Sequence, residues 1–132
     1  MRITVAQSAG FCYGVRRAVE LAERAAREDA PCVMLGPIIH NRDVIARLAA
    51  QGIGVAERPE EVPEGSAVIV RSHGESRAVH EALLARGVKI LDATCPNVTR
   101  IHRIVSQAEE RGRVPVIVGM PDHPEVQAIA GW

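Results

Sequence analysis

The sequence predicts an α/β fold in which helices cover a parallel sheet. Short apolar runs alternate along the chain with longer segments whose apolar residues recur at helical spacing. The runs show no polar alternation, which is typical of strands that are buried on both faces. Hydrophobic residues make up 47% of the 132 residues and aromatic residues only 2%, so we expect a core of Val, Ile, Leu and Ala.

Six apolar runs are predicted to be strands, because aliphatic residues fill them and turn-forming or polar residues follow them. In chain order they are RITVA (2–6), CVMLG (32–36), IGVAE (53–57), AVIV (67–70), VKILDA (88–93) and VPVIV (114–118).

The first predicted helix covers residues 14–28, where Val15, Ala18, Val19 and Ala22 fall on one face and charged residues on the other. The remaining helices are predicted by the same periodicity and by the glycines that follow some of them. They cover residues 41–52, 76–87 and 97–111, with a short last segment at 123–131.

The charge balance excludes some classes of partner. Sixteen basic residues offset sixteen acidic residues, which gives no electrostatic reason to expect a nucleic acid or an anionic membrane surface as partner. The sequence has no signal-peptide core and no run long enough to span a membrane, so we expect a cytoplasmic protein. Structural disulfides are rare there, and Cys12, Cys32 and Cys95 are therefore predicted to be free thiols, metal ligands or redox groups.

Five residues capable of chemistry follow predicted strands and precede predicted helices. They are Cys12, His40, His73, Cys95 and His123. The carboxyl ends of parallel strands meet at one edge of a sheet, where loops and helix N-termini converge on ligands. We therefore expect these five side chains to form one site.

The three cysteines differ in their surroundings. Cys32 lies inside an apolar strand, where a cysteine is usually a small core side chain. Cys12, in GFCYG, and Cys95, before Pro96, lie at predicted helix starts, which favour the thiolate that binds metals. Such thiolates could bind zinc, although no C-x-x-C pair supports a zinc site. An iron–sulfur cluster held by separated cysteines suits the spacing equally well.

Three further polar residues have ordinary structural explanations. His80 lies within a predicted helix and is interpreted as a surface residue, whereas His102 is a candidate to support the site from behind. Glu125 lies at a helix start, where a carboxylate also complements the helix dipole.

Five motifs together resemble the N-terminal part of the 4-hydroxy-3-methylbut-2-enyl diphosphate reductases, the LytB family of the non-mevalonate isoprenoid pathway. They are GFCYGVRRAV, IIHNRDV, SHG, DATCPNVTRIH and DHPEV, in the family's order and approximate spacing. The resemblance extends over the whole chain, which is less than half of the family's usual length.

The resemblance implies a [4Fe-4S] cluster on three cysteines and a reductive loss of the substrate's hydroxyl as water, which yields isopentenyl and dimethylallyl diphosphate. Cys12 and Cys95 match the first two cluster ligands, and the third is expected beyond Trp132. His40 and His73 match the diphosphate-binding histidines. His123 matches the histidine near the hydroxyl end of the substrate, and Glu125 matches the glutamate that supplies protons.

The family's fold has three similar α/β domains. By this resemblance, residues 1–95 are the first domain, which carries cluster and diphosphate ligands, and residues 96–132 are the beginning of a second. An electron donor such as ferredoxin or flavodoxin is implied as a partner, and the chain by itself is expected to be an incomplete fragment. The alternatives are a non-catalytic α/β module that binds a phosphorylated metabolite and a zinc-dependent hydrolase that uses Cys12, Cys95 and a histidine.

Overall fold

The computed structural model describes residues 1–28 and 30–132, and it confirms the predicted α/β class. Four parallel strands form a sheet in the order β2-β1-β3-β4. They are β1 (Cys32–Leu35), β2 (Gly54–Ala56), β3 (Ala67–Val70) and β4 (Lys89–Asp92).

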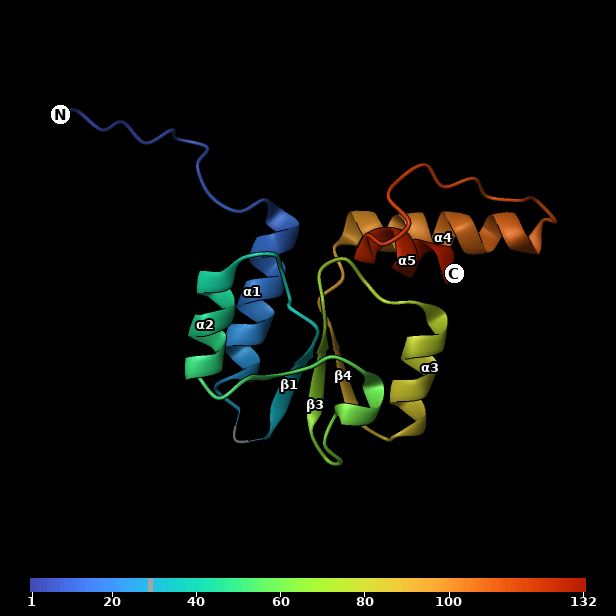
Figure 1. Cartoon of the computed structure of the whole chain (residues 1–132), viewed down its shortest axis with the longest axis horizontal. Coiled ribbons are helices and arrows are strands. Elements are labelled where there is room, and N and C mark those ends of the chain that lie inside the picture. Colours follow the sequence, from blue (N-terminus) through green and yellow to red (C-terminus); the bar gives the residue numbers. More distant parts are fainter. Residues whose placement is uncertain (29) are drawn as a thin grey trace.

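Helices cover both faces of this sheet and one of its edges (Figure 1). On one face lie α1 (Tyr13–Ala25) and α2 (Arg42–Ala50), and on the other lie the 3₁₀ turn η1 (Pro59–Glu61) and α3 (Arg77–Ala85). Two more helices, α4 (Pro96–Glu110) and α5 (Pro124–Ala130), contact each other beyond the carboxyl ends of the strands. No helix in the described part of the chain is long and apolar enough to cross a membrane.

The central strands alternate their side chains between two apolar layers. Met34 and Ile69 are fully buried against the side of α1 and α2, while Val68 and Val70 are fully buried on the side of α3. Cys32 belongs to the first layer and is 8% exposed, as expected for a core side chain. Burial on both faces explains why the strands read as continuous apolar runs.

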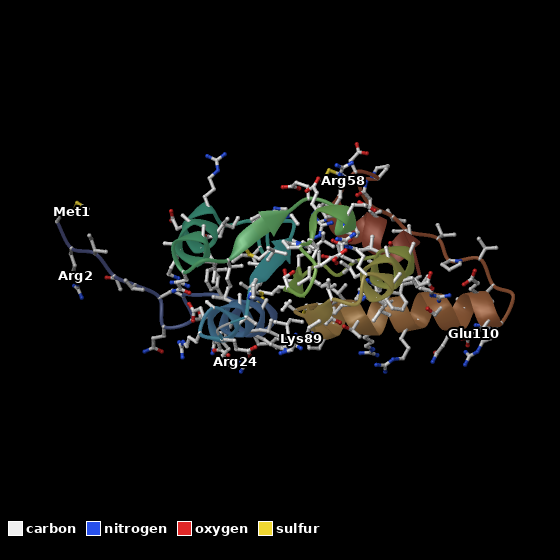
Figure 2. The ribbon with its side chains drawn as sticks, turned by 90° about the horizontal axis from the view of Figure 1, so that it is seen from below. Met1, Arg2, Arg24, Arg58, Lys89 and Glu110 are labelled. Atoms are coloured by element: carbon white, nitrogen blue, oxygen red, sulfur yellow. The ribbon has the colours of Figure 1, made fainter. Side chains whose placement is uncertain are left out.

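Two of the predicted strands are wrong. Residues 2–6 and 114–118 form no strand, and their apolar side chains are exposed, with Val5 at 75% and Val116 at 84%. The N-terminal segment runs away from the sheet in both views, with Met1 and Arg2 at its tip (Figures 1 and 2). A strand needs a neighbour for its backbone hydrogen bonds, and neither segment has one among the described residues.

The strand order creates a switch point between β1 and β3. The chain leaves β1 toward β2 on one side and returns to place β3 on the other side of β1. Connections that diverge in this way leave a crevice at the carboxyl ends of the two central strands, where α/β proteins bind ligands. His40 follows β1 and His73 follows β3.

Candidate functional site

Three imidazole rings meet at this edge of the sheet. The ring centroids of His40 and His73 are 4.6 Å apart, those of His73 and His123 are 5.9 Å apart, and those of His40 and His123 are 6.3 Å apart. The three residues come from segments far apart in the sequence. The structure therefore brings together all three histidines that the sequence placed in one site.

Backbone hydrogen bonds hold the first two rings in place. The Ser72 N–H donates to the carbonyl of Ile38 at 3.1 Å, which joins the connection after β3 to the connection after β1. His73 itself lies in a tight turn closed by the Gly74 N–H and the Arg71 carbonyl at 3.0 Å. Gly74 has φ +78°, a conformation that favours glycine.

His123 is the N-cap of α5. Its Nδ1 accepts a hydrogen bond from the backbone N–H of Glu125 at 3.2 Å. Nδ1 therefore carries no proton, so the neutral ring carries its proton on Nε2, where it is free to be donated to a ligand. Glu125 lies in the first turn of the same helix, and its carboxylate also complements the helix dipole there.

The environment of His73 favours the neutral imidazole. Its pKa is lowered from 6.5 to about 4, chiefly by burial and further by the neighbouring His40, Arg71 and His123. Its Nδ1 is buried and has no hydrogen-bond partner among the described residues. A buried polar atom without a partner is uncommon in a folded protein and is typical of a site that a ligand completes.

Cys12 and Cys95 lie at the starts of two helices. Cys12 is the N-cap of α1 and is exposed, and Cys95 is the N-cap of α4 and is partly exposed. Neither N-cap side chain hydrogen-bonds the first turn of its helix. The positive end of the helix dipole stabilises a thiolate at such a position.

Gly14 lets the two helix starts approach each other. A Cβ atom at this position would lie 2.6 Å from the Cys95 Sγ, so any other residue would displace that sulfur. The Cys95 sulfur thus packs against the first turn of α1, two residues beyond Cys12. The pKa of the nearby Tyr13 is raised chiefly by desolvation, then by the charge of Cys95 and a hydrogen bond with it, and least by the charge of Cys12.

Arg17 connects α1 to the segment that carries Cys95. Its guanidinium donates to the carbonyl of Thr94 at 3.1 Å and to that of Asp92 at 3.3 Å. The Cys95 N–H in turn donates to the carbonyl of Ser72 at 2.9 Å. The second thiol is therefore tied both to α1 and to the turn that bears His73.

A cavity of about 280 Å³ lies between the start of α1 and two of the imidazoles. Phe11 and Val15, on either side of Cys12, line one wall, and His40 and His73 line the other. A ligand in this cavity would contact the imidazoles while lying beside the start of α1.

The site differs from the sequence prediction in one respect. Cys12 and His123 reach this edge without following a strand, because the helices that they begin are docked there directly. Within the described residues, no group of three or more His, Cys, Asp or Glu side chains is placed to hold a metal ion. Cys12 and Cys95 are two candidate donors, and Cys32 lies apart from them in the core, where burial raises its pKa.

Sequence reasoning missed an ion pair behind His73. Arg71 Nε lies 2.6 Å from the Glu75 carboxylate, which is 9% exposed, so the pair spans the turn that bears His73. The i, i+4 spacing of the two charges in RSHGE was the available signal. His80, interpreted as a surface residue, is half-buried, and its ring lies 6.0 Å from that of Trp132.

Comparison with known proteins identifies the family of this chain. The family model described as "LytB protein" matches residues 3–132. The chain belongs to the LytB family. It is 45% identical to the 4-hydroxy-3-methylbut-2-enyl diphosphate reductase of Aquifex aeolicus over 98% of its own length, and 42% identical to that of Caldanaerobacter subterraneus subsp. tengcongensis over its full length.

Solved structures of the LytB family have the same fold. A structure described as the terminal enzyme of the non-mevalonate pathway superposes with a TM-score of 0.84 at 45% identity, over 98% of this chain and 46% of the other. The reductase structure from Plasmodium falciparum superposes with a TM-score of 0.90 at 29% identity, over 95% of this chain and 40% of the other. The chain thus spans about half the length, or less, of the LytB proteins that it matches.

Proposed function

We propose that this chain forms the N-terminal part of a 4-hydroxy-3-methylbut-2-enyl diphosphate reductase and supplies two cluster ligands and much of the substrate site. The observation that carries the proposal is the meeting of three imidazoles from three segments beside two helix-start thiols. Membership of the LytB family supports this activity, because the relatives are named 4-hydroxy-3-methylbut-2-enyl diphosphate reductase.

Cys12 and Cys95 fit two ligands of an iron–sulfur cluster. Both thiols lie at helix starts that favour the thiolate, and Gly14 admits the Cys95 sulfur next to α1. The third cysteine ligand lies outside the 132 residues in this proposal. The cluster, when bound, supplies electrons and an open iron site for the substrate's hydroxyl.

His40 and His73 bind the diphosphate. Neutral imidazole N–H groups and main-chain N–H groups at helix starts donate hydrogen bonds to phosphate oxygens without needing a basic surface, which suits a chain of zero net charge. The unpartnered Nδ1 of His73 gains a partner when the anion binds. The approaching negative charge also raises the pKa of His73 and strengthens these hydrogen bonds.

His123 and Glu125 act at the other end of the substrate. The hydrogen bond from the Glu125 N–H to the His123 Nδ1 leaves the Nε2 proton of His123 available to the substrate's hydroxyl. Glu125 supplies the protons that the reaction consumes, since loss of a hydroxyl as water requires a proton donor. The proposal extends to a cytoplasmic location and to ferredoxin or flavodoxin as electron donor.

A chimeric enzyme tests the reaction. Residues 1–132 would replace the matching N-terminal part of the Aquifex aeolicus reductase, and the loss of hydroxyl would be followed anaerobically with a chemically reduced viologen dye. We expect turnover, and we expect Glu125→Gln to lower kcat by roughly a hundredfold. Glu81→Gln, an exposed change on α3, is the matched control. A chimera that holds its cluster but produces no isopentenyl or dimethylallyl diphosphate would contradict the proposal.

The imidazole cluster, formed by the rings of His40, His73 and His123, favours one alternative function when it is considered alone. All three rings belong to this chain, so a module that binds a phosphorylated metabolite without catalysis would need nothing further. Titration with inorganic pyrophosphate under iron-free conditions measures this binding directly. His40→Ala and His73→Ala should weaken it, whereas His80→Ala on α3 should not. Tight metabolite binding with no cluster incorporated by the chimera would favour the alternative.

A further inference from the structure

Helix α5 carries His123 and Glu125, but little of the chain before it fixes its position. Residues 111–122, which connect α4 to α5, are exposed throughout. The helix has only seven residues, too few to be stable without tertiary contacts. The placement of His123 against His73 therefore depends on how the rest of α5 is docked.

The end of α5 is anchored by Trp132, the single tryptophan of the chain. Its indole Nε1–H donates to the carbonyl of Glu75 at 2.9 Å, two residues beyond His73. Its ring stacks on His102 of α4 with centroids 5.0 Å apart and an interplanar angle of 15°. The Arg77 guanidinium lies 5.7 Å from the ring centroid, at a cation–π distance.

Main-chain hydrogen bonds strengthen the same junction. The Arg77 N–H donates to the carbonyl of Gly131 at 3.2 Å, and the Arg77 guanidinium donates to the carbonyl of Trp132 at 3.0 Å. The Ser106 hydroxyl of α4 donates to the same Trp132 carbonyl at 3.3 Å. A side chain at Gly131 would overlap with Ser76, so the two backbones meet closely.

This junction lies directly behind the turn that bears His73. A Cβ atom at Gly74 would lie 2.6 Å from His102 Cε1, so the ring that stacks on Trp132 also packs against the next residue after His73. His102 is 4% exposed. Glu75, whose carbonyl receives the indole N–H, also forms the ion pair with Arg71 across the same turn.

We propose that Trp132 is a positioning residue, which acts with His102 to dock α5 on the His73 turn and so sets His123 opposite His73. Its role in substrate recognition rests on the function proposed above, since His123 is there the group that contacts the substrate's hydroxyl. Trp132 itself acts only through the position of α5.

The geometry is tested by NMR on the 132-residue chain. Wild-type protein should show nuclear Overhauser contacts between the His73 and His123 rings, whose centroids are 5.9 Å apart. Trp132→Ala should abolish them, and Trp132→Phe, which retains a ring to stack on His102, should restore them. Leu84→Ala, at a 65% exposed position on α3, is the control. If the contacts persist in Trp132→Ala, the proposal is wrong.

Ligand preference provides the functional readout. Wild-type protein should bind 4-hydroxy-3-methylbut-2-enyl diphosphate about fivefold more tightly than dimethylallyl diphosphate, which lacks the hydroxyl and hence one hydrogen bond. In Trp132→Ala this preference should fall to nearly one, while the affinity for inorganic pyrophosphate stays within about twofold. Loss of pyrophosphate affinity as well would overturn the specific role of Trp132.

The two proposals fail in different ways. If the wild-type chain binds neither diphosphate, the proposed function fails, while the ring contacts still decide the role of Trp132. If the Trp132→Ala chain is unfolded, as loss of the amide signals of β1 and β3 would show, Arg77→Gln is measured in its place. The Arg77→Gln change is at an exposed position and removes both the hydrogen bond to the Trp132 carbonyl and the cation–π contact. Unchanged ring contacts in Arg77→Gln would then overturn the proposal.

Discussion

The imidazole cluster and the thiol pair are built differently, although they share one edge of the sheet. Two of the three imidazoles follow adjacent central strands, and the partly buried ring of His73 is held by backbone hydrogen bonds from both connections. The two thiols lie at helix starts, and α1 is joined to the Cys95 segment through Arg17 and the close approach at Gly14. The proposed anion site is thus supported by the core of the sheet, whereas the thiol spacing depends on a helix contact.

The largest expected effect separates Cys12 from the core thiol Cys32. After anaerobic reconstitution with iron and sulfide, Cys12→Ser should lose nearly all bound iron and sulfide, because only two described thiols lie at the site. Cys32→Ser, in the core layer of α1 and α2, should keep both. Iron and sulfide counts per chain provide the measurement.

Equal iron content in Cys12→Ser and wild-type protein would show that Cys12 is not a cluster ligand. A count near half a cluster per wild-type chain would instead mean that two chains share one cluster.

A smaller effect should follow from closing the gap at Gly14. In Gly14→Ala the new methyl group displaces the Cys95 sulfur, since a Cβ would lie 2.6 Å from it. We expect iron incorporation to fall severalfold while pyrophosphate binding at the imidazoles is retained. Gly54→Ala in β2 is the matched control, because its Cβ would meet Val33 at an ordinary 3.6 Å. Normal iron content in Gly14→Ala would show that the close contact does not set the thiol spacing.

The half-buried imidazole of His73 predicts a pH-dependent stability. The pKa of His73 is about 4 in the folded chain and 6.5 ordinarily, so the unfolded chain binds a proton first as the pH falls. Stability should fall by about 1–2 kcal/mol between pH 6.5 and 4, less than the full linkage because the ring is only half-buried. Urea midpoints measured across this range provide the test.

His73→Asn should show a shallower decline over the same range, and the remainder should come from His102, whose pKa burial also lowers. Sulfate should reduce the loss in wild-type protein by stabilising the protonated ring. An equal slope in His73→Asn would mean that His73 is not the group responsible.

The smallest effect concerns the residue that follows His40. Asn41 caps α2 by accepting the Val44 N–H at 3.1 Å. Asn41→Ala should lower the free energy of unfolding by about 1 kcal/mol, whereas Asn41→Ser retains a cap and should cost much less. Denaturant titration of both variants gives the difference. Equal losses in the two variants would indicate that the amide matters for another reason.

Much of the site was predictable because it depends on local order along the chain. The apolar runs at 32–36, 67–70 and 88–93 became β1, β3 and β4, and residues after their ends necessarily share an edge of the parallel sheet. Segments 2–6 and 114–118 have the same composition, but whether a strand forms depends on a neighbour that composition does not reveal.

The Trp132–His102 stack was unpredictable for a related reason. The two residues are separated by thirty positions in the sequence, and no periodicity relates them. Their contact follows from the docking of α5 on α4, which is a tertiary event. The sequence indicated only that His102 was a candidate for support behind the site.

The parallel order of the sheet also has a consequence for synthesis of the chain on the ribosome. Parallel neighbouring strands are joined by crossovers rather than hairpins. The central strand β1 therefore cannot pair with its central neighbour β3 until the chain has been made as far as Val70. Cys95 is then positioned only after β4 has paired and its N–H has reached the Ser72 carbonyl. The nascent chain therefore carries Cys12 without Cys95 beside it until β4 has been made and paired. In the proposed function, both thiols can therefore receive iron and sulfide only after more than ninety residues have left the exit tunnel.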